Sequence, residues 1–98
     1  MEYELIIRPE AKADLLDTFQ WYQDQSPGLG HDFKTCVDEV ISKIHRNPQI
    51  YKKVFLDIRR AVIRSFPFGV FYTIEDHNII VIGVLHARRD PESWKKRI

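Results

Sequence analysis

The sequence predicts an α+β fold: one strand, an antiparallel pair of helices, a three-stranded antiparallel meander and a short C-terminal helix. Apolar residues recur at the helical spacing in the first half of the chain, and from residue 54 they alternate as in strands. The chain has 98 residues, 44% of them hydrophobic. This length supports one core, so we expect a single domain over residues 1–98.

The first strand and the first helix meet at a proline. Residues 3–8 are short, β-branched and partly alternating, which is typical of a strand. Pro9 suits the first helical position, because its fixed φ is helical and its missing N–H would be unpaired there anyway. The helix runs to about residue 25, and Trp21 is either a contact at the edge of the helix pair or a binding anchor. Its apolar residues are Ala11, Leu15, Leu16, Phe19 and Tyr22.

A second helix follows the break at Ser26-Pro27-Gly28. It begins within residues 27–31 and ends at Asn47-Pro48, because the residue before a proline disfavours the helical conformation. The short connection predicts that the two helices lie antiparallel. The apolar stripe of the second helix consists of Phe33, Cys36, Val37, Val40, Ile41 and Ile44.

Three strands are expected at residues 58–66, 69–75 and 78–87, and their short connections predict an antiparallel meander. The third strand is apolar on both faces, so both must be covered. The helix pair can cover one face, and the C-terminal segment, another copy or a partner must cover the other. Asp90-Pro91-Glu92 is typical of a helix start, and Trp94 is the expected lid. Strict alternation puts Ile79, Val81 and Leu85 on one face and Ile80, Ile82 and Val84 on the other.

Composition and charge narrow the class of protein. One cysteine, Cys36, excludes an internal disulfide and indicates a reducing compartment. The four histidines lack zinc-ligand spacing, and no stretch approaches a membrane span, so we expect a cytoplasmic protein without metal or cofactor. Residues 1–45 carry a net charge of −5 and residues 46–98 one of +6. Either the basic half faces an anionic partner, or two solvated faces simply differ in sign.

Three segments together resemble the RelE/ParE superfamily of bacterial toxins: YELIIRPEAKADLLDTFQWY, IRRAVIRSFPFGVFYTIE and VIGVLHARRDPESWKKR. They cover essentially the whole chain, in the superfamily's order. The resemblance implies the toxin of a type II toxin–antitoxin module, often described as a plasmid stabilisation protein. It also implies a hetero-oligomer with a cognate antitoxin that wraps the toxin. ParE-like members bind DNA gyrase, whereas RelE-like members cut messenger RNA on the ribosome, and a third possibility is a non-toxic homologue that only binds its antitoxin.

A metal-free ribonuclease needs an acid or base beside cations that hold phosphate. The candidates are His86 as acid or base, with Arg60, Arg64 and Arg88 as phosphate ligands. If the strands run regularly, His86 and Arg88 share one face, as do Arg60 and Arg64. The alternative for His86 is structural, with a backbone hydrogen bond at the end of a strand.

Two departures favour the ParE branch. No Tyr or His follows His86, where many RelE-like enzymes carry one, and a net charge of +1 suits an RNA-lined cleft poorly. We therefore expect a gyrase-binding toxin with a basic, partner-facing surface. The residues expected to bind the partner are Arg59, Arg60, Arg64, Arg88, Arg89, Trp94, Lys95 and Arg97.

Overall fold

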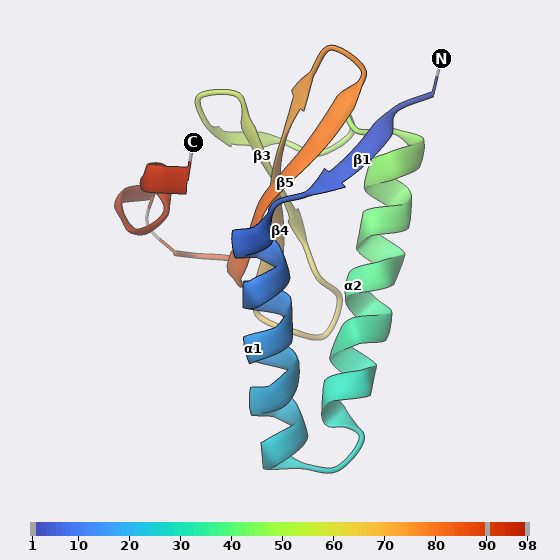
Figure 1. The fold of residues 1–98 in the computed structure, drawn as a ribbon, viewed down its shortest axis with the longest axis vertical. Coiled ribbons are helices and arrows are strands. Elements are labelled where there is room, and N and C mark those ends of the chain that lie inside the picture. The colour runs from blue at the N-terminus through green and yellow to red at the C-terminus, as the bar shows by residue number, and fades with distance from the viewer. Residues whose placement is uncertain (1, 90, 98) are drawn as a thin grey trace.

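The computed structural model describes residues 2–89 and 91–97. A layer of two antiparallel helices lies against a sheet, which confirms the predicted α+β class (Figure 1). The chain ends in two short 3₁₀ turns, at Pro91–Ser93 and Lys95–Arg97. The other elements are β1 (Glu4–Ile7), α1 (Pro9–Gln25), α2 (Leu29–Arg46), β2 (Lys53–Phe55), β3 (Ile58–Val62), β4 (Phe68–Glu75) and β5 (Asn78–His86).

The sheet has five strands in the order β1-β5-β4-β3-β2. β1 pairs in parallel with β5, and the remaining pairs are antiparallel, so the predicted meander is present as β3, β4 and β5. β2 was not predicted, because it has three residues and pairs irregularly with β3. β5 lies between β1 and β4, which explains why its residues are apolar on both faces.

α2 buries more of its side chains than α1 does. Phe33, Val37 and Ile44 of α2 are at most 1% exposed, whereas Ala11 is the buried residue of α1. Leu16, expected on the apolar stripe of α1, is 66% exposed. The helix with the more regular apolar stripe therefore contributes more side chains to the core.

The helices approach closely where α2 begins. A Cβ atom at Gly30 would lie 2.6 Å from the carbonyl oxygen of Phe19 and 2.9 Å from Oε1 of Gln23. The same Oε1 accepts a hydrogen bond of 3.0 Å from the Gly30 N–H, one of the N–H groups that a helix start leaves unpaired. Gly30 thus sets the distance between α1 and α2.

A β-bulge interrupts the alternation of β5. Phe71 lies opposite Gly83 and Tyr72 lies opposite Val81, so Ile82 is an extra residue. After it the faces exchange: Val84 packs in the cluster beneath the helices and Leu85 packs on the opposite face. The predicted faces of Val84 and Leu85 are therefore wrong, because the prediction assumed strict alternation through residue 82.

The two ends of the predicted meander also differ from expectation. β3 stops at Val62, since Ser65 adopts a left-handed φ of 68° in a tight turn that leads into β4. The C-terminal helix is a pair of 3₁₀ turns, and its expected cap, Asp90, lies outside the described residues. The predicted lid is confirmed, because Trp94 packs against the face of the sheet opposite the helices.

We predict that Gly30→Ala destabilises the protein by about 1–3 kcal/mol, because the added methyl group meets the Phe19 carbonyl. Alanine is the better helix former by about 1 kcal/mol, so without the close approach the variant would be more stable. Urea unfolding followed by circular dichroism measures the difference. Ser42→Ala, at an exposed position of the same helix, should stay within about 0.5 kcal/mol of the native protein.

Tyr72 makes stability depend on alkaline pH. Its side chain is fully buried in β4, its hydroxyl donates a 2.7 Å hydrogen bond to the Pro48 carbonyl, and burial raises its pKa to about 12. The unfolded chain loses this proton near pH 10, so the stabilisation is complete below pH 10 and lost as pH rises toward 12. We predict that urea unfolding shows a loss of about 1.4 kcal/mol per pH unit there, relative to Tyr72→Phe. Parallel pH curves for the two proteins would contradict this assignment.

Candidate functional site

The C-terminal segment seals the face of the sheet that the helices leave open. Trp94 is 2% exposed and packs with Ile58, Phe71, Ile82 and Leu85. Its ring centroid lies 5.0 Å from that of Phe71, and its indole N–H donates a 3.4 Å hydrogen bond to a backbone carbonyl. The sequence analysis placed Trp94 among the partner-binding residues, but its side chain is buried inside the protein.

Arg97 fastens this segment to α1. Its guanidinium contacts both carboxylate oxygens of Asp14, with Nη1–Oδ2 at 2.5 Å and Nη2–Oδ1 at 3.1 Å. The Arg8 guanidinium donates to the Arg97 carbonyl. Hydrogen bonding to Asp14 raises the pKa of Arg97 above its ordinary value. Arg97 therefore serves an intramolecular contact, and the sequence analysis missed its partner, Asp14.

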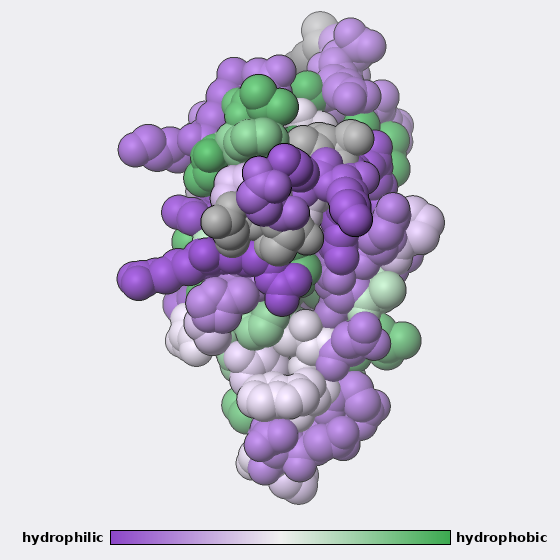
Figure 2. Space-filling view, turned by 90° about the vertical axis from the view of Figure 1, so that its left-hand side faces the viewer, coloured by the Kyte–Doolittle hydropathy of each residue, from purple (hydrophilic) through white to green (hydrophobic). Residues whose placement is uncertain are grey.

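A basic pocket of about 300 Å³ lies beside Trp94, and Arg60, Arg88 and Arg89 line it. Arg60 is fixed, because its Nη1 donates a 2.7 Å hydrogen bond to the Ala87 carbonyl. The side chains of Arg88 and Arg89 are exposed and form no ion pair within the described residues. Hydrophilic side chains fill the middle of this side of the molecule (Figure 2). Guanidinium groups arranged in this way suit a carboxylate or phosphate.

The other predicted basic residues have partners within the chain. Arg59 donates to the carbonyls of Gln49 and Tyr51, at 3.1 and 2.6 Å, and so holds the loop before β2. Arg64 pairs with Glu39 of α2 at 3.2 Å, and hydrogen bonding to Glu39 raises its pKa.

Lys95 has a partner of the same kind, since it pairs with Glu92 at 2.8 Å. These pairs leave Arg88 and Arg89 as the arginines of the predicted set whose guanidinium groups have no partner within residues 2–89 and 91–97.

His86 lies on the helix side of the sheet. Its Nδ1 accepts a 3.3 Å hydrogen bond from the Arg88 N–H, as the structural alternative predicts. Its ring lies 6.0 Å from that of Phe68, and with Asp17 and Trp21 it lines an open pocket of about 440 Å³. The bulge in β5 puts the ring there, because it moves even-numbered residues after Ile82 to the helix side.

The candidate nuclease residues are therefore divided. Arg60 and Arg88 share the basic pocket, but His86 and Arg64 do not line it. Both expected pairings are wrong: His86 and Arg88 do not share a face, because the chain turns after β5, and Arg60 and Arg64 do not, because β3 ends at Val62.

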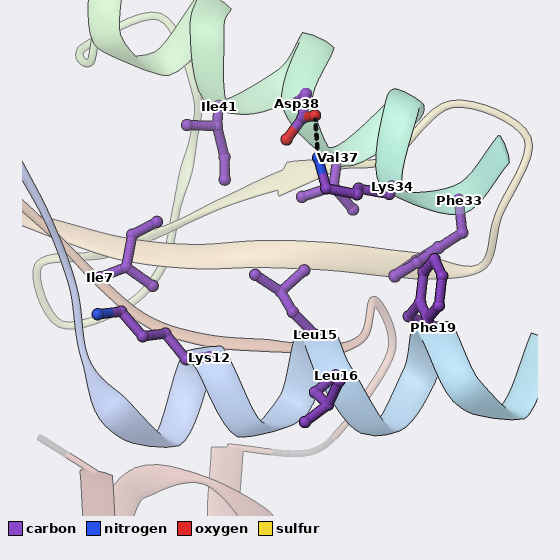
Figure 3. Close-up of a pocket in the computed structure, with 10 residues that line it drawn as sticks. All are labelled: Ile7, Lys12, Leu15, Leu16, Phe19, Phe33, Lys34, Val37, Asp38 and Ile41. Carbon is purple, nitrogen blue, oxygen red and sulfur yellow. Dashed lines mark hydrogen bonds and ion pairs between the residues drawn. The ribbon is translucent and has the colours of Figure 1, made fainter. Parts of the chain in front are cut away.

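An apolar groove of about 420 Å³ separates the outer edges of the two helices (Figure 3). Leu15 and Phe19 of α1 point toward α2 across it, where Val37 and Ile41 line the other wall. Leu16 lies at its margin and points away from α2. The Lys34–Asp38 ion pair, drawn as a dashed line, borders it. The sequence analysis missed the groove. Its signal was that the apolar residues of α1 extend beyond the one face that packs on the core.

Two classes of site have no counterpart in the described part of the chain. Residues 2–89 and 91–97 contain no group of three or more His, Cys, Asp or Glu side chains arranged to hold a metal ion. No helix among them is long and apolar enough to cross a membrane.

Comparison with known proteins identifies the family. A family model described as the ParE toxin of the type II toxin–antitoxin system parDE matches residues 5–91. The chain belongs to this ParE toxin family. The predicted resemblance to the RelE/ParE superfamily, and to its ParE branch, is thereby confirmed. No curated protein matches the chain.

Two solved structures share the fold of this ParE-family chain. A chain of the chromosomal ParDE toxin–antitoxin system from P. aeruginosa matches with a TM-score of 0.79 and 13% identity, over 89% of this chain and 98% of that one. A mutant of the E. coli toxin RelE in the free state matches with a TM-score of 0.69 and 20% identity, over 100% and 99%. These likenesses show a common fold and do not separate the two activities.

We predict that a double-mutant cycle of Asp14→Asn and Arg97→Gln gives a coupling free energy of about 1–3 kcal/mol, because the pair is bidentate and largely buried. Urea unfolding supplies the four free energies of unfolding. A control cycle of Lys34→Gln and Asp38→Asn, whose side chains are 65% and 62% exposed, should give less than about 1 kcal/mol. Equal coupling in the two cycles would show that the Arg97 contact is an ordinary surface pair.

Proposed function

We propose that this ParE-family protein arrests growth by binding DNA gyrase, and that a cognate antitoxin neutralises it by forming a complex with it. The family match supports the toxin class and the antitoxin partner. The choice of gyrase over messenger RNA rests on one observation, the separation of His86 from the free arginines.

Cleavage of RNA needs an acid or base within hydrogen-bond reach of a phosphate that cations already hold. Here the free cations and the imidazole line different pockets on opposite faces of the sheet. The carboxylate beside His86 is Asp17, which repels a phosphodiester. Arg64 is already paired with Glu39. This arrangement therefore favours a binding surface rather than a catalytic site.

The basic pocket is the surface that we propose contacts the target. Arg88 and Arg89 supply the exposed charge, and Arg60, held by the Ala87 carbonyl, supplies a fixed guanidinium beside them. Trp94 and Arg97 act indirectly, because they hold the C-terminal segment that forms one wall of this pocket. An acidic protein surface is the complementary partner.

We predict that Arg88→Gln/Arg89→Gln reduces inhibition of gyrase supercoiling at least tenfold, since each guanidinium can form a charge-assisted bond worth about 1 kcal/mol or more. Dose–response curves with purified protein measure the change, and growth after induced expression gives a second readout. Lys43→Gln/Arg46→Gln removes the same charge from the last turn of α2 and should leave inhibition unchanged.

Other outcomes would favour the two alternatives. Arg60 and Arg88 do share a pocket, so a RelE-like ribonuclease remains the second candidate. It would replace the proposal if the protein cleaved messenger RNA on translating ribosomes and left gyrase unaffected, and if folded His86→Ala lost that cleavage. Normal growth with abundant soluble protein would instead indicate a non-toxic homologue that binds its antitoxin.

A further inference from the structure

The pocket around His86 has walls made of aromatic rings. Centroids of successive rings lie 5.1 Å apart for Trp21–Tyr22, 6.1 Å for Tyr22–Phe68 and 6.0 Å for Phe68–His86. Interplanar angles of 80°, 74° and 58° turn the rings against one another, so they form an arc rather than a stack. The arc joins α1 to the ends of β4 and β5.

Trp21 gives this arc an exposed face. Its side chain is 57% exposed, although it is the neighbour of Tyr22, which packs against the main core. A tryptophan in that environment keeps a large apolar surface in water, a cost that a partner could relieve.

The charge of the pocket is negative. Asp17 lies one helical turn before Trp21 on α1 and lines the same pocket, and no lysine or arginine lines it. Within residues 2–89 and 91–97 the Asp17 carboxylate forms no ion pair. Asp14, the preceding acid on this helix, is by contrast paired with Arg97. Asp17 is thus available to a charge from outside the chain.

Aromatic faces and a free carboxylate together select a cation. The negative faces of aromatic rings attract cations within about 6 Å, and tryptophan does so most strongly. An uncharged apolar group would desolvate Asp17 without compensation, and an anion would be repelled. A guanidinium satisfies both features, because it stacks flat on an indole while its forked N–H groups reach a carboxylate.

We propose that this pocket receives the guanidinium of an arginine side chain from a partner protein. Asp17, Trp21 and His86 are all exposed, so the pocket is shallow and suits a side chain whose stem and backbone stay outside. This site is separate from the basic pocket, which has the opposite charge and lies on the other face of the sheet. The protein therefore presents one acceptor for acidic groups and one for basic groups.

The test titrates ¹⁵N-labelled full-length protein with Nα-acetyl-arginine amide and, in parallel, with the uncharged isostere Nα-acetyl-citrulline amide. The chain has two tryptophans, and Trp21→Phe identifies which indole N–H signal belongs to Trp21. We expect a saturable shift of the Trp21 signal with the arginine compound, at least fivefold weaker binding of the citrulline compound, and an unmoved signal from buried Trp94.

Two matched variants locate the charge. Asp17→Asn should weaken binding of the arginine compound about fivefold, the upper range for an exposed charge pair. Asp24→Asn, on the same helix and outside the pocket, should leave it unchanged. Equal shifts with both compounds, an unmoved Trp21 signal on the native chain, or unchanged binding by folded Asp17→Asn would each overturn the proposal.

Discussion

The carboxylate of Asp14 connects α1 to the edge of β5 and to the C-terminal segment that covers the far face of the sheet. β1 pairs with β5 only as far as Val81, so the N–H groups of β5 beyond that point lose their neighbouring strand. The Asp14 carboxylate accepts one of them, from Val84 at 3.0 Å, and also pairs with Arg97. One side chain of α1 thus replaces a missing strand and fixes the segment that carries Trp94. Without it, the apolar face beneath Trp94 would meet water.

The basic residues in the second half of the chain fall into two groups, those with a partner in the described part of the molecule and those without one. Arg59, Arg64 and Arg97 complete contacts inside the molecule, and Arg88 and Arg89 remain for contacts outside it. A net charge counted along the chain therefore overstates the charge that a partner meets. The acids of α1 divide in the same way, because Arg97 neutralises Asp14 and Asp17 remains free.

Periodicity in the sequence was sufficient to predict the two helices and four of the five strands, because the apolar residues of each recur at the spacing of that element. It could not predict β2, whose three residues pair irregularly, or the faces of Val84 and Leu85, which depend on one extra residue. The candidate site was the part of the structure that the sequence predicted least well. Arg64 and Arg97 appear as free cations in a sequence, and only the folded chain brings Glu39 and Asp14 to them.

The bulge at Ile82, and not the composition of β5, decides which face each later residue of the strand occupies. Deleting Ile82 would leave Val81 opposite Tyr72 and Gly83 opposite Phe71, so the ladder would become regular while Leu85 and His86 kept their faces. Keeping Ile82 as a regularly paired residue would instead slip the register after it by one, which turns Leu85 toward the helices and His86 toward the side of Arg60 and Arg88. A slip of one residue, with no change of sequence, thus separates the observed fold from one in which an imidazole and the arginines share a face.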